Sequence, residues 1–136
     1  QGAQQAMEDA GIRFEDKLYG LSNYDFESAY HAMNGLLARR AEFTALFAMS
    51  DVIAFGAIRA LVSAGLRVPE DVSVIGFDGI TMSRYCVPVM TTIVQPSEQI
   101  ALQSIELLVR QIEHGTPAQT VTLQPELQQG ESVRAI

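Results

Sequence analysis

The chain has 136 residues, 48% of them hydrophobic and 18% charged, which suits one folded domain or one lobe of a larger protein and excludes a disordered chain. A formal net charge of −7, with nine Lys and Arg residues and no long basic run, argues against this chain gripping a nucleic-acid backbone by itself. The single cysteine, Cys86, excludes an internal disulfide and fits a reducing, cytoplasmic compartment, and no 18-residue apolar run predicts a membrane span.

The first part of the chain predicts two helices and a short strand. Apolar residues at a spacing of three to four predict a helix over residues 2–10, and Gly11 is a natural stop. Residues 17–21 are a strand candidate. Asp25 is the expected N-cap of a second helix over residues 26–39. The apolar face of that helix comprises Phe26, Ala29, Tyr30, Met33, Leu36 and Leu37.

The interpretation centres on the stretch that follows. Residues 44–49 form a short apolar run, typical of a buried strand. A polar pair, Ser50 and Asp51, comes next, and Asp51 is expected to cap a helix that runs to about Ala64 and stops at Gly65.

This third helix is apolar on nearly all sides, with Arg59 and Ser63 its only clearly polar residues. A helix of this kind is buried on more than one side. Two interpretations stay open: the helix lies at the centre of a thick domain, or its outer face meets a second subunit.

The second half of the chain predicts further strands and a long helix. Residues 71–77 form a second buried strand with Asp78 at its end, and residues 91–94 form another, ended by Gln95. Ser97 is expected to cap a helix that reaches His114, with Ala101, Ile105, Leu108 and Ile112 on its core stripe, and residues 120–123 are expected to form a final strand.

Alternating strands and helices predict an α/β fold, a parallel sheet sandwiched by helices. Ligands bind beyond the carboxyl ends of the strands in such sheets, and two of the predicted strands are followed there by acidic residues. This edge is therefore the predicted binding edge.

Motifs that would indicate catalysis or a cofactor are missing from the sequence. It contains neither a G-x-G-x-x-G nor a P-loop pattern. His31 and His114 lie far apart without metal-ligand spacing, and Cys86 has no evident base nearby. We expect no catalytic residue, no metal and no cofactor.

Four stretches together closely resemble the lactose/galactose repressor family (LacI/GalR): residues 47–57, 65–78, 88–96 and 127–132. The resemblance implies a bacterial transcription regulator with an N-terminal helix-turn-helix and a two-lobed effector domain like the type I periplasmic sugar-binding proteins. Since the sequence pattern places Gln1 inside a helix, we expect a fragment that lacks the DNA-binding helix-turn-helix.

In that family's terms, residues 1–92 and 118–136 correspond to the C-terminal lobe of the effector domain. Residues 93–117 correspond to a crossover segment that belongs to the N-terminal lobe. The family places an Arg of the effector clamp three residues before the glycine matched by Gly2, which is upstream of this chain.

The resemblance implies four effector-binding positions. Tyr24 matches an aromatic residue that stacks on the effector. The alternative is that its ring only covers the start of the second helix. Ser50 matches a position that is often Asn, a departure that leaves one donor and a shorter reach. Asp78 matches an acidic residue that accepts hydrogen bonds from the effector, with a turn-forming Asp as the alternative. Gln95 matches a crossover residue near the pocket and hinge.

The resemblance also implies a dimer surface built from the third helix and the loop over residues 80–86. The residues expected there are Ile53, Ala57, Ala60, Leu61, Met82 and Tyr85.

These observations predict a module of a LacI-type regulator that senses a small-molecule effector, a sugar or related metabolite, and forms a homodimer. Operator DNA would be bound through the missing N-terminal domain and not by this fragment. A periplasmic sugar-binding protein of a transport system is the alternative, and an enzyme that uses Asp78 as an acid or phosphoacceptor is a third class. A helix-turn-helix or a signal segment upstream would discriminate the first two.

Overall fold

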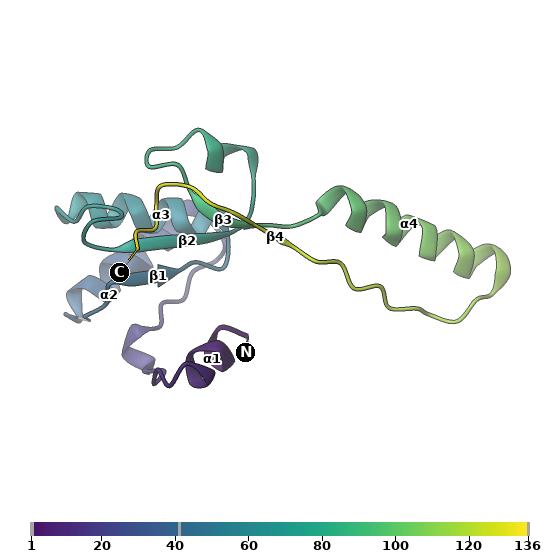
Figure 1. The fold of residues 1–136 in the computed structure, drawn as a ribbon, viewed down its shortest axis with the longest axis horizontal. Coiled ribbons are helices and arrows are strands. Elements are labelled where there is room, and N and C mark those ends of the chain that lie inside the picture. Colours follow the sequence, from purple (N-terminus) through teal and green to yellow (C-terminus); the bar gives the residue numbers. More distant parts are fainter. Residues whose placement is uncertain (1, 41, 136) are drawn as a thin grey trace.

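The computed structural model describes residues 2–40 and 42–135, so the predicted helical setting of Gln1 lies outside the described residues. A compact body comprises residues 26–40, 42–95 and 126–135, and an arm of residues 96–125 projects from it (Figure 1). The helices are α1 (Gly2–Asp9), α2 (Phe26–Ala38), α3 (Asp51–Ser63) and α4 (Ser97–His114), with short 3-10 turns η1 (Asp16–Leu18) and η2 (Thr81–Arg84).

The sheet has four strands in the order β1 (Ala45–Phe47), β2 (Ser73–Asp78), β3 (Thr91–Val94) and β4 (Glu126–Gln128). β1, β2 and β3 are parallel, whereas β4 pairs antiparallel with β3. The α/β class with a mostly parallel sheet is therefore confirmed. β4 runs the opposite way because β3 carries the chain out to the arm and β4 brings it back (Figure 1).

Two predicted strands are wrong. Residues 17–21 enter a 3-10 turn at Asp16–Leu18 and then an irregular segment. Residues 120–123 are still on the returning side of the arm, whereas residues 126–128 align with residues 92–94 of β3 and become the strand. A strand needs a partner edge for its backbone groups, and periodicity alone cannot say where that edge lies.

β1 is shorter and more exposed than the predicted buried run of residues 44–49. It pairs only with β2, so it is an edge strand, and Phe47 is 45% exposed. Ala48, just beyond it, is buried in the core. The apolar composition identified the strand but not its position in the sheet.

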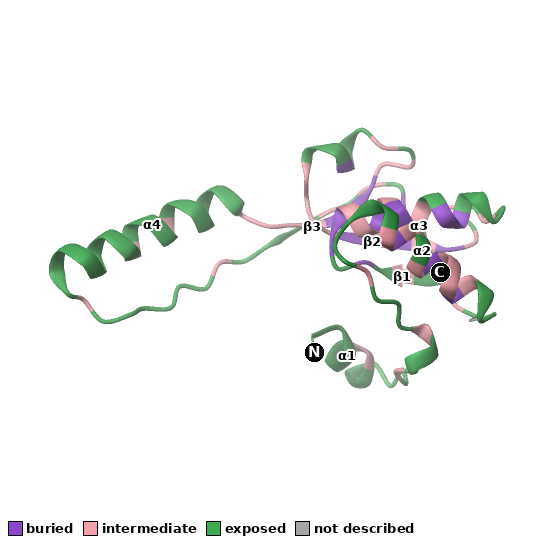
Figure 2. Ribbon diagram, turned by 180° about the vertical axis from the view of Figure 1, so that it is seen from behind, coloured by how far each residue is buried: buried purple, intermediate pink, exposed green. Residues whose placement is uncertain are grey.

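The core lies where α3 packs against β2 and α2 packs against α3 (Figure 2). Its buried apolar side chains come from α2, α3, β2 and the residue before β3, and include Met33, Leu36, Ala54, Leu61, Val74 and Met90. Val74 and Gly76 of β2 are buried, while the alternate residues Ile75 and Phe77 are half-buried, as expected for a strand with one face under a helix.

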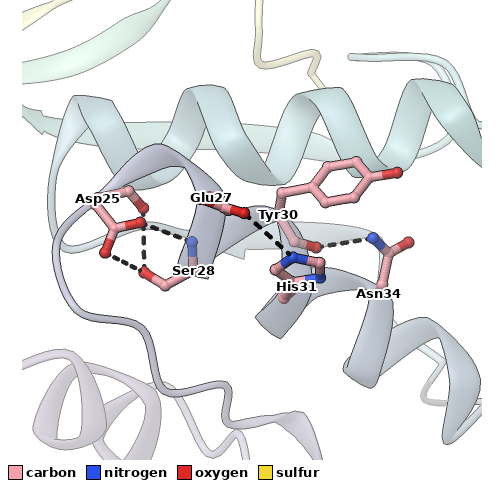
Figure 3. A network of polar contacts seen from close by, with 6 residues as sticks. All are labelled: Asp25, Glu27, Ser28, Tyr30, His31 and Asn34. Atoms are coloured by element: carbon pink, nitrogen blue, oxygen red, sulfur yellow. Dashed lines mark hydrogen bonds and ion pairs between the residues drawn. The ribbon is translucent and has the colours of Figure 1, made fainter.

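The predicted helix boundaries agree closely with the structure. The Oδ1 of Asp25 accepts a hydrogen bond from the N–H of Ser28 at 2.7 Å, which confirms Asp25 as the N-cap of α2 (Figure 3). These hydrogen bonds from Ser28 lower the pKa of the Asp25 carboxyl. Gly11, Gly65 and Gly115 follow their helices with positive φ angles, which confirms the predicted stops. Ser97 is the first residue of α4 and makes no capping hydrogen bond, so that predicted cap is wrong.

The C-terminal segment forms hydrogen bonds with both β2 and β3. The buried Ser132 accepts a hydrogen bond from the N–H of Thr91 at 2.8 Å and donates one to the carbonyl of Val74 at 2.6 Å. Its own carbonyl accepts from the N–H of Val74. Ser132 is fully buried because its side chain and carbonyl satisfy backbone groups of both strands.

Close packing of α2 on α3 depends on Gly56. A Cβ at Gly56 would collide with the carbonyl oxygen of Phe26 and lie 2.8 Å from the Cβ of Ala29. Gly35, inside α2, has no atom within 4 Å of the same position. The two glycines therefore form a matched pair of helix positions.

Replacing Gly56 with Ala should destabilise the protein by about 2 kcal/mol or more, because backbone must move to admit the methyl group. Gly35→Ala should instead stabilise it by about 0.5–1 kcal/mol, since it removes a flexible residue from a helix at no steric cost. Denaturant unfolding of the full-length protein measures both changes. Equal effects of the two substitutions would contradict this packing.

The loop between α3 and β2 is closed by an ion pair. The guanidinium of Arg67 donates to both carboxylate oxygens of Asp71, at 2.9 Å and 2.8 Å, and the Arg67 N–H donates to the same side chain at 2.8 Å. These hydrogen bonds hold the pKa of Asp71 well below its ordinary value of 3.8.

A carboxyl whose pKa is lower in the folded state stabilises the fold above its unfolded pKa. The contribution of Asp71 should therefore be present above about pH 4 and be lost as the pH falls below that. Asp71→Asn should remove this pH dependence, so its unfolding midpoint should approach that of the unmodified protein between pH 4 and pH 2. Asp16→Asn, at a carboxylate with no side-chain hydrogen bond among the described residues, is the control. Curves for Asp71→Asn and the unmodified protein that stay parallel would refute the assignment.

Candidate functional site

The carboxyl ends of β1, β2 and β3 lie at one edge of the sheet because these strands are parallel. Ser50 follows β1, Asp78 ends β2 and Gln95 follows β3. The chain leaves the body for the arm from the same edge (Figure 1). We call this the binding edge.

Asp78 and Gln95 are joined at the binding edge by two hydrogen bonds. The side-chain Nε2 of Gln95 donates to Oδ1 of Asp78 at 2.7 Å, and the backbone N–H of Gln95 donates to the carbonyl of Asp78 at 3.1 Å. The second carboxylate oxygen, Oδ2, has no hydrogen bond among the described residues. Two of the four predicted effector residues are thus in contact, and one carboxylate oxygen is left to accept a hydrogen bond.

The backbone turns sharply at Asp78. Its φ angle is +112°, a region that non-glycine residues rarely adopt and that costs on the order of 1–3 kcal/mol. Gly79 follows with a φ of +72°, and a Cβ there would lie 2.7 Å from Val94. Strain of this kind persists only where surrounding contacts fix the backbone, and it is concentrated at functional sites.

A buried carboxylate beneath the edge supplies such contacts. Asp51 is fully buried; its Oδ2 accepts from the N–H of Ile80 at 2.8 Å and its Oδ1 accepts from the hydroxyl of Thr92. A Cβ on Gly76 would collide with this carboxylate, so the strand beside it needs glycine. Asp51 therefore joins the start of α3, the turn after β2 and strand β3.

This role of Asp51 was missed by the sequence analysis, which assigned the helix cap to it. The cap is Ser50, whose Oγ accepts from the N–H of Ile53 at 3.2 Å, and Asp51 is the first residue of α3. The available signal was an acidic residue in the first turn of an otherwise apolar helix, where the helix dipole favours negative charge.

The other two predicted effector residues differ in accessibility. Ser50 is 5% exposed and its hydroxyl already caps α3. Tyr24 is 64% exposed and stands beside the cap of α2 with a φ of +58°. No hydrogen bond among the described residues joins either of them to Asp78 or Gln95. Their contact with an effector stays a prediction, for which Tyr24 offers an accessible ring and Ser50 little free surface.

An apolar groove lies on a different part of the body, between the start of α2, the outer side of α3, and η2 with the segment that follows it. We call it the α3 groove. Its lining residues are Phe26, Phe55, Ile58, Arg59, Val62, Met82, Cys86, Val87 and Pro88. Burial raises the pKa of the Cys86 thiol, whose sulfur lies 3.3 Å and 3.2 Å from the carbonyl oxygens of Ser83 and Pro88, either of which can accept its hydrogen.

The structure corrects three residues of the predicted dimer surface. Ala57, Ala60 and Leu61 are buried in the chain's own core, because they lie on the sides of α3 that meet β2 and α2. Met82 and Tyr85 are exposed, and Ile53 is half-buried against the core. The predicted surface therefore keeps its elements, but α3 would contribute Phe55, Ile58 and Val62 to it.

Other candidate centres do not assemble. Within residues 2–40 and 42–135, no group of three or more His, Cys, Asp or Glu side chains is placed to hold a metal ion. His31 lies on α2 at 4.0 Å from Glu27 of the same helix, whereas His114 ends α4 (Figure 3). Among the described helices, none is both long and apolar enough to cross a membrane.

Comparison with known proteins gives one consistent family. Residues 1–133 match the family described as periplasmic binding protein-like domain. The chain is 39% identical over 131 residues to the HTH-type transcriptional regulator MalR of Clostridium butyricum, covering 96% of this chain and 39% of MalR. It is 38% identical to the HTH-type transcriptional repressor PurR of Serratia proteamaculans, covering 98% and 39%. The chain thus spans about two fifths of these relatives.

Solved structures agree with the sequence matches. The regulator CelR in complex with cellobiose superposes with a TM-score of 0.92 at 34% identity, covering 97% of this chain and 41% of that one. A sugar-binding LacI-family regulator from Escherichia coli, in complex with phosphate, gives a TM-score of 0.87 at 32% identity, covering 97% and 48%.

Proposed function

This chain belongs to the LacI-type transcriptional regulators, with the fold of their periplasmic binding protein-like domain, and on that premise we propose that it senses a small-molecule effector and forms a dimer. The observation that carries the proposal is the Asp78 carboxylate at the carboxyl edge of three parallel strands, with one oxygen free to accept from a ligand. The similarity to named regulators favours this role over a periplasmic transport protein.

A carbohydrate is the proposed effector class. Hydroxyl groups can donate to Oδ2 of Asp78, and the exposed ring of Tyr24 offers an apolar face that suits a sugar ring. Two structural neighbours carry cellobiose and lactose, which makes oligosaccharides the first compounds to test. We propose no catalytic step at this edge and a cytoplasmic location for the whole protein.

We further propose that the body is the C-terminal lobe and that the arm packs within the N-terminal lobe. The support comes from α4, which has no buried residue although Ala101, Ile105, Leu108 and Ile112 form an apolar stripe along it. An apolar stripe of this length on a helix normally faces a core. The effector would then bind between the lobes, and operator DNA would be bound by a domain outside this chain.

The effector proposal predicts that Asp78→Asn weakens sugar binding about tenfold to a hundredfold, since a hydrogen bond to a charged group contributes about 1.5–3 kcal/mol. The test is a thermal-shift and calorimetric titration of the full-length protein with cellobiose, lactose and maltose, and with hypoxanthine as a non-sugar. Glu70→Gln is the control. Glu70 lies in the loop before β2, at the opposite end of the strand from Asp78, so this substitution should leave the affinity for sugar unchanged. A variant that binds sugar as tightly as the unmodified protein would exclude Asp78 from the site.

The dimer proposal places the α3 groove at the subunit interface, because it is the apolar surface formed jointly by α3 and the segment after η2. Val62→Asp should then raise the dimer dissociation constant about tenfold or more, because it places a charged group in an apolar interface. Ser63→Asp, one residue further along α3 and outside the groove, should have little effect. Sedimentation of the full-length protein measures both, and an unchanged Val62→Asp dimer would place the interface elsewhere.

A further inference from the structure

We propose that Gln95 is a positioning residue, which orients the Asp78 carboxylate toward the ligand and links the occupied site to the segment that carries the chain into the arm. This inference rests on the proposed function of Asp78 as an effector acceptor. It adds a residue whose own role is to hold that acceptor and to restrict what it can recognise.

Gln95 makes two separate hydrogen bonds to Asp78. Its backbone N–H fixes the carbonyl of Asp78, and its side-chain amide fixes Oδ1. The first bond continues the pairing of β2 with β3 by one residue, from the register of Asp78 with Val94. The second bond selects the rotation of the carboxylate, so that Oδ2 is the oxygen with no hydrogen bond to any of the described residues.

The rest of the turn is already fixed, so the amide of Gln95 is the contact that settles the direction of the carboxylate. Asp51 holds the N–H of Ile80 from beneath, and Gly79 lies against Val94 with no room for a side chain. Contacts of the neighbouring residues on both sides therefore fix the backbone of Asp78 at its positive φ angle. Within this frame the side chain still has its own torsions, which the hydrogen bond from Gln95 removes.

A glutamine is chemically suited to this position. Its amide donates a hydrogen bond without bringing a positive charge, so it forms no ion pair with Asp78 and leaves the second carboxyl oxygen to accept from the ligand. An acceptor held in this way favours ligand hydroxyl or N–H groups and rejects ligand carboxylates and phosphates. Gln95 thereby contributes to specificity for neutral, hydroxyl-rich ligands.

The same residue stands at the exit from the body. Pro96 follows it directly and α4 begins at Ser97, so a shift of the Asp78 carboxylate on ligand binding reaches the arm through Gln95. A ligand that binds one arrangement of the two parts better than another shifts the equilibrium between them.

The test is Gln95→Glu, which keeps the shape but replaces the donor with a second carboxylate. Two carboxyl groups in hydrogen-bond contact share a proton at low pH and repel each other once both are charged. At pH 8 the variant should bind cellobiose or lactose about tenfold more weakly than the unmodified protein or worse. At pH 5 the protonated Glu should again donate to Asp78, and most of the affinity should return.

The same pair gives a readout that needs no ligand. A carboxyl that holds its proton to higher pH in the folded state than in the unfolded state makes stability fall as the pH rises. The unfolding midpoint of full-length Gln95→Glu, relative to the unmodified protein, should therefore decrease from about pH 4 upward until the pair is fully charged. Gln128→Glu is the matched control, since Gln128 lies in the same sheet but contacts Arg84 and Ser83.

The outcomes separate this inference from the proposed function. A pH-dependent loss of both stability and sugar affinity in Gln95→Glu, absent from Gln128→Glu, supports the inference. A pH-dependent loss of stability with no binding of cellobiose or lactose by any form of the protein supports the contact but overturns the ligand role assigned to it. If the unfolding midpoint and the sugar affinity of Gln95→Glu change with pH in the same way as those of the unmodified protein, the inference is overturned even where the sugar binds.

Discussion

The buried carboxylate of Asp51 is the contact on which the arrangement of the binding edge depends. It accepts from the N–H of Ile80 and the hydroxyl of Thr92 and lies in the first turn of α3. A buried charge is tolerated only where hydrogen bonds replace its water, and here a helix N-terminus adds favourable electrostatics. The bonds join three elements that are far apart in the sequence. The turn that presents Asp78 is therefore built on the core.

The two ends of the turn after β2 lead to different surfaces. Asp78, at its start, belongs to the binding edge, and Met82, a few residues later in η2, lines the α3 groove. The anchor at Ile80 lies between them and is bonded to α3. A ligand at one surface and a subunit at the other would thus act on the same short segment. This proximity gives a physical basis for communication between effector binding and dimerisation in the proposed function.

The arm carries an apolar surface that the described residues of the chain do not cover. The core is confined to α2, α3 and the sheet, whereas α4 carries an apolar stripe with no buried residue. The chain spans about two fifths of its curated relatives, and the proposed packing of the arm against a second lobe would cover that stripe. The binding edge lies where the arm leaves the body (Figure 1). A ligand held between two lobes would therefore contact the connection between the body and the arm.

The sequence alone determined the class of the fold, most of the helices and the family. These follow from local signals: periodicity for α2 and α3, the cap at Asp25, and the glycine stops after α1, α3 and α4. It also placed Asp78 and Gln95 at strand ends, since each comes directly at the close of an apolar run. Such features depend on residues within a few positions of one another.

Tertiary structure decided what depends on distant partners. Only the pairing with β3 made residues 126–128 the last strand in place of residues 120–123. Only the packing of α2 and β2 buried Ala57, Ala60 and Leu61, while Phe55, Ile58 and Val62 stayed in the groove. Ser50 caps α3 in place of Asp51, because the carboxylate of Asp51 instead accepts from Ile80 and Thr92, which are 29 and 41 residues away in the chain. Local chemistry specifies which element forms, but the side of an element that is covered is set by whatever packs against it.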